Sequence, residues 1–159
     1  MKRAGNLFVT VGADTLSQAM LERYQKNVTL GQVEQCCRLL EKHGIYYMVE
    51  CIFGGPGETE QTLQESLAFL HKIKPTLTIL NAGLRILPRT DLYQVALAEG
   101  LVRDRAELLF SKYYFAKTIS RDVLYRQIDA YNRRYGYRNA RMVLMLMHRQ
   151  MRLRFGQGH

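Results

Sequence analysis

The feature that most constrains the fold is the apolar segment "IYYMVECIF" at residues 45–53, which leads through a glycine-rich turn into a helical pattern. The segment is a nearly continuous apolar run with β-branched and aromatic residues, and Glu50 is its one charged residue. Such a run is typical of a strand that is buried on both faces of a parallel sheet. Leucines at the spacing of one helix face then predict a helix over residues 60–74, with Thr59 or Glu58 as its cap.

The same strand-then-helix unit recurs along the chain. We expect strands at residues 7–11, 45–53 and 76–87, and helices at residues 16–24, 30–42, 60–74 and 92–99. Strands that alternate with helices pair in parallel through right-handed crossovers. Such sheets carry their functional groups at the carboxyl ends of the strands, where residues 12–14, 54–58 and 85–90 form the expected loops. The chain is therefore expected to have an α/β fold with its site at that edge of the sheet.

The pattern changes after Gly100. Residues 103–159 are rich in aromatic and basic side chains, and helices are expected at residues 121–134 and 139–154. We therefore divide the chain into residues 6–102, which hold three β/α units, and residues 103–159, which form a mainly helical C-terminal extension.

The net charge of +9 belongs largely to this extension, because much of the excess follows Arg121. A basic helical tail can bind nucleic acid or a membrane surface, although packing on the rest of the protein or on a partner is the favoured interpretation. No apolar stretch approaches the length of a transmembrane helix. The apolar run at residues 7–11 is too short for a signal peptide, so an intracellular, cytoplasmic protein is expected.

The three cysteines, Cys36, Cys37 and Cys51, contain no CxxC pair. Their spacing indicates neither a disulfide framework nor a zinc site, and they are expected to be small buried hydrophobic residues. None of the four histidines is placed for a catalytic triad. No catalytic residue and no metal ligand is assigned from the sequence.

The glycine turn "GGPGE" at residues 54–58 has two possible explanations. Strand, glycines and helix start together form a shape that can accept a ligand on backbone N–H groups, but a tight structural turn needs the same residues. The turn matches neither GxxxxGK[ST] nor GxGxxG. Glu58 would repel a phosphate and suits an amine, a ribose hydroxyl or a helix cap instead.

Arg85 lies late in an apolar strand, where a charged group needs a partner. It can hold a ligand carboxylate through two hydrogen bonds, or it can form a salt bridge with Glu50, Asp14 or Asp91. The neighbouring polar residues also have ordinary roles available to them, because Asp14 can cap a helix and Asn81 can satisfy backbone groups.

Taken together, the segments at residues 9–102 resemble the second half of the radical S-adenosylmethionine (SAM) barrel, and in particular the cobalamin-binding branch of that superfamily. The resemblance rests on a Gly-x-Asp turn at residues 12–14, on "FGGPGET" at residues 53–59 and on "RILPRTDLYQVALAEGL" at residues 85–101. These motifs occur in the order that the family shows. The resemblance implies the second half of a (β/α)6 barrel, followed here by the helical extension.

The resemblance also implies contacts with S-adenosylmethionine. In the family, residues at the positions of Asp14 and Thr15 contact the ribose or the methionine part, and the last strand reaches the adenine and the carboxylate. Mapped onto this chain, the implied cofactor-binding residues are Asp14, Thr15, Ile52, Gly54, Gly55, Asn81, Arg85 and Leu87. On this hypothesis the glycines let the backbone approach a bound nucleoside, and no lysine is needed because no triphosphate is held.

The chain departs from the family in one respect, since the CxxxCxxC motif that ligates the 4Fe-4S cluster is absent from the sequence. The family's first three strands and a cobalamin domain are also absent. We therefore expect a C-terminal fragment, a split subunit or a degenerate relative that performs no radical chemistry by itself. A 4Fe-4S cluster is expected only if a missing N-terminal half supplies it, and cobalamin is a possible cofactor of the full-length family whose use here the sequence leaves open.

A three-stranded half barrel has two open sheet edges, which predicts a partner. The edges are expected to be covered by an N-terminal radical SAM half on another chain, by a second copy of the chain, or by the chain's own C-terminal helices folded across the gap. The alternative function is a non-catalytic interaction module, in which the half barrel is a scaffold and the basic tail binds a partner or nucleic acid.

Overall fold

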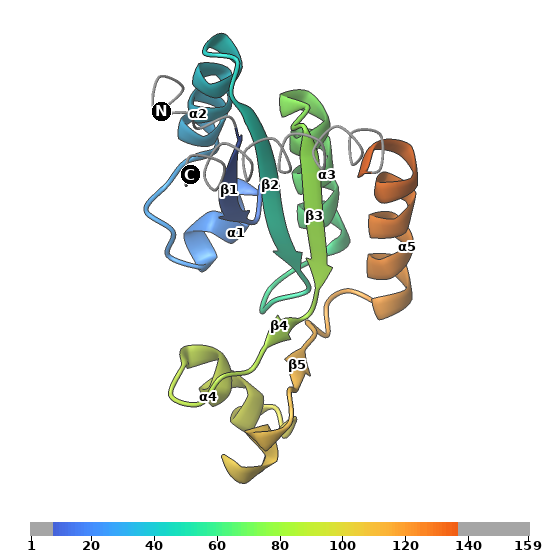
Figure 1. Ribbon diagram of the computed structural model, residues 1–159. Coiled ribbons are helices and arrows are strands. Elements are labelled where there is room, and N and C mark those ends of the chain that lie inside the picture. Colours follow the sequence, from blue (N-terminus) through green and yellow to red (C-terminus); the bar gives the residue numbers. More distant parts are fainter. Residues whose placement is uncertain (1–7, 137–159) are drawn as a thin grey trace, which may run out of the picture.

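The computed structural model describes residues 8–136 (Figure 1). The elements, in chain order, are β1 (Phe8–Asp14), α1 (Gln18–Arg23), α2 (Leu30–Lys42), β2 (Tyr46–Phe53), α3 (Glu60–Ile73), β3 (Leu77–Ala82), β4 (Leu84–Arg85), α4 (Asp91–Ala98), the 3-10 helix η2 (Ala106–Leu109), β5 (Tyr113–Tyr114), α5 (Arg121–Tyr131) and the π-helical turn η3 (Asn132–Gly136). The expected helix at residues 139–154 lies outside the described residues.

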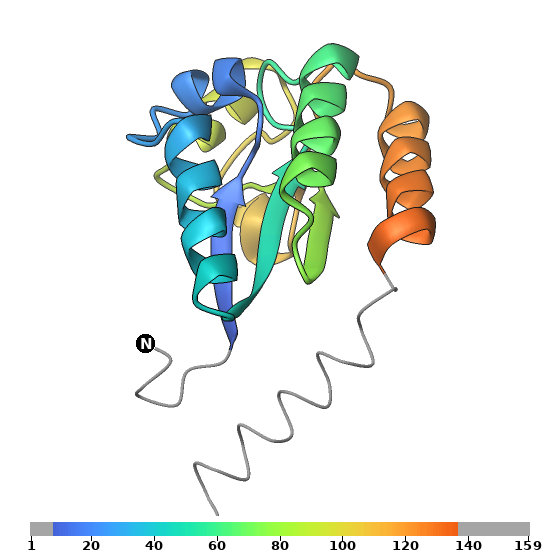
Figure 2. The same ribbon diagram turned by 90° about the horizontal axis from the view of Figure 1, so that it is seen from above.

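The central sheet has the strand order β1-β2-β3, and both pairs are parallel, as the alternation of strands and helices predicts. Helices α2 and α3 connect successive strands and lie side by side on one face of the sheet (Figure 2). Helix α5 continues this layer beside α3 and the edge strand β3 (Figure 1). The mixed α/β fold and its parallel sheet are therefore as expected.

Helix ends follow from local residue chemistry. Thr29 begins α2 with a capping box, in which its hydroxyl accepts from the N–H of Gln32 and the Gln32 side chain accepts from the N–H of Thr29. Thr59 and Thr62 form the same arrangement at α3, so Thr59 rather than Glu58 is the cap. Gly44 follows α2 with a φ of 60°, a left-handed conformation that favours glycine.

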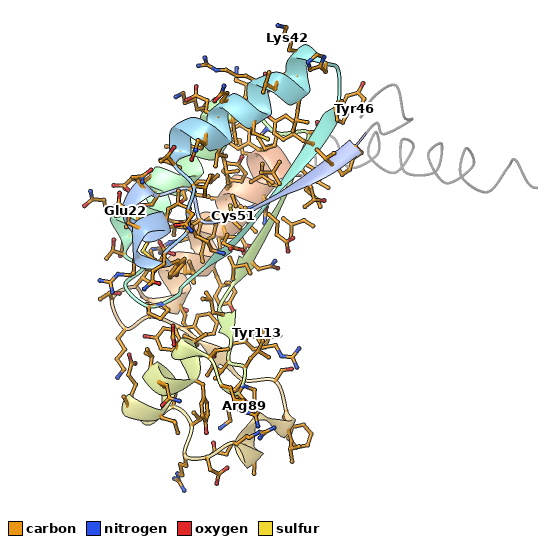
Figure 3. The ribbon with its side chains drawn as sticks, turned by 90° about the vertical axis from the view of Figure 1, so that its left-hand side faces the viewer. Glu22, Lys42, Tyr46, Cys51, Arg89 and Tyr113 are labelled. Carbon is orange, nitrogen blue, oxygen red and sulfur yellow. The ribbon has the colours of Figure 1, made fainter. Side chains whose placement is uncertain are left out.

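The core lies between the sheet and the helices. Alternate residues of β2 point to the helix layer and are almost fully buried, namely Tyr47, Val49, Cys51 and Phe53. Leu63 and Leu70 of α3 are likewise fully buried, as helical spacing predicts. Figure 3 shows Cys51 on the side of the sheet that carries the helices. The burial of apolar side chains by this layer is the main stabilising contribution to the fold.

The expectation that residues 45–53 are buried on both faces is wrong. Burial along β2 alternates strictly, and Tyr46, at the start of the strand, is 39% exposed on the face away from the helices. Ile79 of β3 shares this face and is 37% exposed. Because all covering helices of the described residues lie on one side, the other face of the sheet stays open, and we call it the open face (Figure 3).

Residues 84–114 form a lobe beyond the carboxyl ends of the strands (Figure 1). The expected strand at 76–87 is interrupted at Gly83, whose φ of 85° bends the chain, and β4 then pairs with β5 in antiparallel fashion. The chain returns from the lobe as a short segment, residues 115–119, which we call the strap. The N–H of Ala116 in the strap donates to the carbonyl of Gly54 at 2.8 Å. The expected extension is thus in direct contact with the β/α units.

Candidate functional site

The open face carries exposed polar groups near the carboxyl ends of β2 and β3. Strand register aligns Gly12 of β1 with Glu50 of β2 and with Ile79 of β3, and it aligns Ile52 with Asn81 in the next row. The side-chain amide of Asn81 donates to Glu50 Oε1 over 3.4 Å. We call this set of five residues the open-face site.

The open-face site combines polar and apolar surface. Glu50 offers carboxylate oxygens that accept hydrogen bonds, and Asn81 offers both a donor and an acceptor. Ile52 and Ile79 flank this pair and can contact a flat apolar group. Gly12 leaves the neighbouring position of β1 without a side chain, and no atom lies within 4 Å of where its Cβ would be. The arrangement suits a ligand that has a planar ring and hydroxyl or amino groups.

Asp14 and Thr15 separate at the end of β1. Asp14 lies after a register shift with a φ of 57°, and its carboxylate forms an ion pair with Lys26. Thr15 is completely buried on the helix side, where its hydroxyl lies 3.4 Å from the hydroxyl of Ser66. The structure therefore gives Thr15 a packing role and leaves Asp14 at the edge where the open-face site ends.

The glycine turn is filled by the chain's own side chains. A Cβ added to Gly55 would lie 2.0 Å from the hydroxyl of Tyr24, and a Cβ on Gly57 would lie 2.3 Å from Arg23 Nε. Gly54 has a φ of 90° and faces Leu124 and Phe115. The need for glycine is thus explained by close packing within the protein, which was one of the two explanations left open by the sequence.

Glu58 is buried at the end of this turn. Its side chain accepts a hydrogen bond from Thr62, while its Oε2 atom has no partner among the described residues. Burial raises the pKa of this carboxyl above its usual range, and the hydrogen bond from Thr62 opposes the rise in part. The strap covers the turn, since the Thr118 hydroxyl donates to the Glu58 carbonyl. Glu58 is therefore an interior residue and not an exposed ligand contact.

Arg85 and Leu87 lie in the lobe and are exposed. Within residues 8–136 Arg85 forms no salt bridge, so the suggested pairs with Glu50, Asp14 and Asp91 are not formed. Its direct neighbour across the β4–β5 pair is Tyr113, which is 52% exposed (Figure 3). The expectation that Arg85 lies late in one strand over residues 76–87 is wrong, because β3 ends at Ala82 and Arg85 belongs to the short strand β4 in the lobe.

Three residues of the open-face site were not selected from the sequence as ligand contacts, namely Gly12, Glu50 and Ile79. Glu50 was noted as the exception in its strand and as a partner for Arg85. The signal that could have found it is the alternation of faces along a strand. Residues 47, 49, 51 and 53 are apolar and face the helices, whereas Glu50 lies between them and faces the other side. A charged residue on the side of the strand opposite the apolar set predicts that this side of the sheet is not covered by helices.

The cysteines behave as expected in part. Cys37 and Cys51 are buried and Cys36 is exposed, and none forms a disulfide. Burial raises the pKa of the Cys37 thiol to about 11. In the described part of the chain, no group of three His, Cys, Asp or Glu side chains is placed to hold a metal ion. The same residues contain no helix that is long and apolar enough to cross a membrane.

Sequence comparison identifies related enzymes. No protein-family model matches the chain. The chain is 31% identical over 91 residues to a tryptophan 2-C-methyltransferase of Streptomyces laurentii, a match that covers 54% of this chain and 15% of that protein. It is 27% identical over 119 residues to an anaerobic magnesium-protoporphyrin IX monomethyl ester cyclase of Cereibacter sphaeroides, with coverage of 74% and 18%.

Structural comparison finds the same kinship. The chain resembles the radical S-adenosylmethionine methyltransferase TsrM of Kitasatospora setae, solved with cobalamin and a 4Fe-4S cluster bound, with a TM-score of 0.50 and 31% identity. This match covers 56% of the chain and 19% of TsrM. A second structure of TsrM, with tryptophan and the SAM analogue aza-SAM bound, also has a TM-score of 0.50. The chain spans less than a fifth of the length of these relatives.

Proposed function

We propose that this chain, which is related over about half its length to radical SAM enzymes of the cobalamin-binding branch, supplies the S-adenosylmethionine-binding part of such an enzyme. In this proposal β1, β2 and β3 are three strands of a (β/α)6 barrel, and the open face of the sheet is turned toward the interior of that barrel. The layer of helices on only one face supports this proposal, because a barrel carries its helices outside.

The observation that carries the proposal is the hydrogen-bonded pair of half-buried Glu50 and exposed Asn81 on the open face, toward the ends of parallel strands where ligands bind in such sheets. S-adenosylmethionine has an adenine ring, ribose hydroxyls and an amino acid part, and the residues present match these groups. Ile52 and Ile79 can contact the ring, while Glu50 and Asn81 can bind hydroxyl or amino groups.

The remaining residues that the resemblance implied take more distant roles in this proposal. Asp14 lies at the end of the neighbouring strand and Arg85 and Leu87 lie in the lobe beyond it, so all three are proposed to contact the methionine end. Gly54 is covered by the strap and Gly55 by Tyr24 and Leu84, and we propose that both glycines fix the end of β2 rather than touch the ligand. Thr15 is proposed to support Asp14 through its buried contact with Ser66.

A radical SAM enzyme also needs a 4Fe-4S cluster, which together with S-adenosylmethionine supplies radical chemistry. The described residues do not fit this group, since they bring no three ligating side chains together and two of the three cysteines are buried on the helix side. We propose that a cluster-bearing half, on another chain or in another region, pairs with this one. Cobalamin would belong to that larger assembly, and the activity is proposed for the assembly.

The test is a titration of the isotopically labelled 159-residue chain with S-adenosylmethionine, followed by NMR. We expect amide shifts to concentrate at Gly12, Glu50, Ile52 and Asn81, and we expect binding to weaken about 3- to 30-fold in Asn81→Ala, because a hydrogen bond to a polar ligand contributes roughly 0.5–2 kcal/mol. Asn27→Ala, which changes an exposed asparagine in the loop before α2, is the matched control and should bind as the parent does.

A second arm uses Glu50→Gln, which keeps the shape of the side chain and removes its charge. Weaker binding in this variant, with an unchanged melting temperature, would support a direct contact with the ligand. An absence of amide shifts at millimolar S-adenosylmethionine, or shifts that avoid the open face, would contradict the proposal.

A further inference from the structure

A separate cavity lies at the opposite end of β3, among residues that the proposed function does not use. Its volume is about 350 Å³, within the range of roughly 300–1,000 Å³ for small-molecule sites. Helix α3, the start of β3 and the end of α5 with η3 enclose it. The lining residues are Leu70, His71, Lys74, Pro75, Thr78, Tyr131 and Tyr135.

Aromatic rings form one wall of this cavity. The rings of Tyr131 and Tyr135 lie 5.0 Å apart at an angle of 46°, and the ring of His71 lies 5.0 Å from that of Tyr135 at 52°. Tyr135 belongs to the π-helical turn η3, so this turn places the ring opposite α3. Single π-helical turns occur frequently at functional sites. The wall can stack on a planar group.

A hydroxyl at the cavity lacks a partner. The Oγ1 atom of Thr78 is buried and forms no hydrogen bond within residues 8–136. Buried hydroxyls are almost always hydrogen-bonded, since leaving one unpaired costs about 1–3 kcal/mol. A polar atom of a bound molecule would remove this cost.

The charge at the cavity has one sign. Lys74 lines it, and the guanidinium of Arg134 lies 5.2 Å from the ring centre of Tyr135. Among residues 8–136, no carboxylate side chain lines the cavity. Lys74 itself has a φ of 44° at the end of α3, a conformation that is uncommon for lysine and sets the direction of its Cα–Cβ bond. The cavity therefore favours an anion.

We propose that this cavity binds a small planar aromatic carboxylate of one or two rings, at a site separate from the open-face site. The ring lies between Tyr131, Tyr135 and the apolar atoms of Leu70 and Pro75. The carboxylate is attracted by Lys74, and the Thr78 hydroxyl donates a hydrogen bond to the ligand. A bound ligand would link α5 to α3 and to the edge strand β3. Without a ligand, α5 is held in this position by side-chain packing.

The experiment compares two probes on the full 159-residue chain by calorimetry and by saturation-transfer NMR. Indole-3-acetate is the anionic probe, and indole-3-acetamide is its neutral counterpart. We expect saturable binding of the acetate and at least 3-fold weaker binding of the amide. Thr78→Val, which keeps the side-chain shape, should weaken both probes about 2- to 10-fold without lowering the melting temperature, because it removes a hydroxyl that has no partner.

Lys74→Asn separates charge from shape, because asparagine tolerates the left-handed conformation of this position. It should weaken the acetate several-fold and leave the amide unchanged. Lys42→Asn at the end of α2 and Thr10→Val in β1 are the matched controls, and neither should alter binding of either probe.

Three outcomes would overturn the proposal. The first is no detectable binding of either probe at millimolar concentration, and the second is binding that both Thr78→Val and Lys74→Asn leave unchanged. The third is a set of NMR contacts in the unliganded protein between the Thr78 methyl group and side chains after residue 136, because the chain itself would then fill the cavity. S-adenosylmethionine binding at the open face is not needed for any of these outcomes.

Discussion

Glu58 shows what a single residue contributes at the glycine turn. Its carboxyl is fully buried, and Oε2 lacks a partner among the described residues. The hydroxyl of Tyr24 is also buried and has no hydrogen-bond partner among the described residues. Its pKa is raised mainly by burial and, to a smaller extent, by the negative charge of Glu58. Burial disfavours the charged carboxylate more than the hydrogen bond from Thr62 favours it, so the pKa of Glu58 is raised and its neutral form is favoured in the folded protein.

The stability of the protein should therefore depend on pH through Glu58. The folded-state pKa lies above the unfolded value, so the folded protein binds more protons. The stabilising contribution is complete below the unfolded pKa and is lost as pH rises through the folded pKa. We expect Glu58→Gln to reduce this loss and to raise the free energy of unfolding by about 1–3 kcal/mol at pH 8, with little effect at pH 4.

Urea denaturation at a series of pH values measures this difference. Glu60→Gln changes an exposed glutamate two residues further on, and its profile should follow that of the parent. Parallel profiles for Glu58→Gln and the parent would show that the buried carboxyl does not titrate on unfolding in this range.

At the scale of elements, the strap holds the ends of β2 and β3 together. Phe115 occupies the space over Gly83, where an added Cβ would lie 2.6 Å from the ring, and Arg121 lies 4.2 Å from the centre of the same ring. The backbone N–H of the adjacent Ala116 donates a hydrogen bond to the carbonyl of Gly54. The strap thus fixes the ends of β2 and β3 against one another, at the place where the open-face site lies.

Removal of this ring should loosen the strap before it unfolds the sheet. We expect Phe115→Ala to lower the free energy of unfolding by about 2–4 kcal/mol, since it deletes a ring that packs on two strand ends. Hydrogen exchange should accelerate most at the amides of Ala116 and Gly83, which donate across this contact. The amide of Val49, in the middle of β2, should change only with global stability.

Phe110→Ala is the matched control for this prediction. Phe110 lies in the lobe and is 83% exposed, so its removal should leave both stability and exchange unchanged. Equal effects of the two substitutions would mean that the ring of Phe115 does not hold the strap.

At the scale of the whole molecule, the open face sets the chain apart from a closed α/β domain. Tyr46 and Ile79 are exposed on it, and β1 has a free edge among the described residues. Exposed strand edges and apolar sheet faces favour association. We propose that a second barrel half, or another copy, pairs with the free edge of β1 and so encloses the open face.

Association should therefore respond to a charge on that face. We expect Tyr46→Glu to shift the isolated chain toward the monomer in sedimentation velocity at high micromolar concentration, because a carboxylate would have to be buried at the interface. Tyr125→Glu introduces the same charge at a tyrosine of α5 that is 47% exposed, and it should have no effect. If the parent chain is monomeric at every concentration, self-association is contradicted. The remaining partner is then a separate barrel half, which can be tested by mixing it with this chain.

Local features of the fold could be predicted from the sequence because they depend on neighbouring residues. The bounds of α2 were predicted correctly from Thr29 and the residues before Gly44, and α3 began as predicted after Thr59. The parallel sheet followed from the alternation of strands and helices. The kinship with radical SAM enzymes followed from the order of the motifs and is confirmed by the related sequences and structures.

Only the tertiary structure decided which face of each strand is covered and what fills the space beside each glycine. Both depend on residues far away in the chain, such as Tyr24 against Gly55 and Phe115 against Gly83. The exposure of Arg85 is also decided by the tertiary structure, because the bend at Gly83 directs the chain into the lobe. Sequence by itself determined the elements and their order, since hydrogen bonding and side-chain periodicity are local. Packing determined the site, since it brings together groups that no local pattern connects.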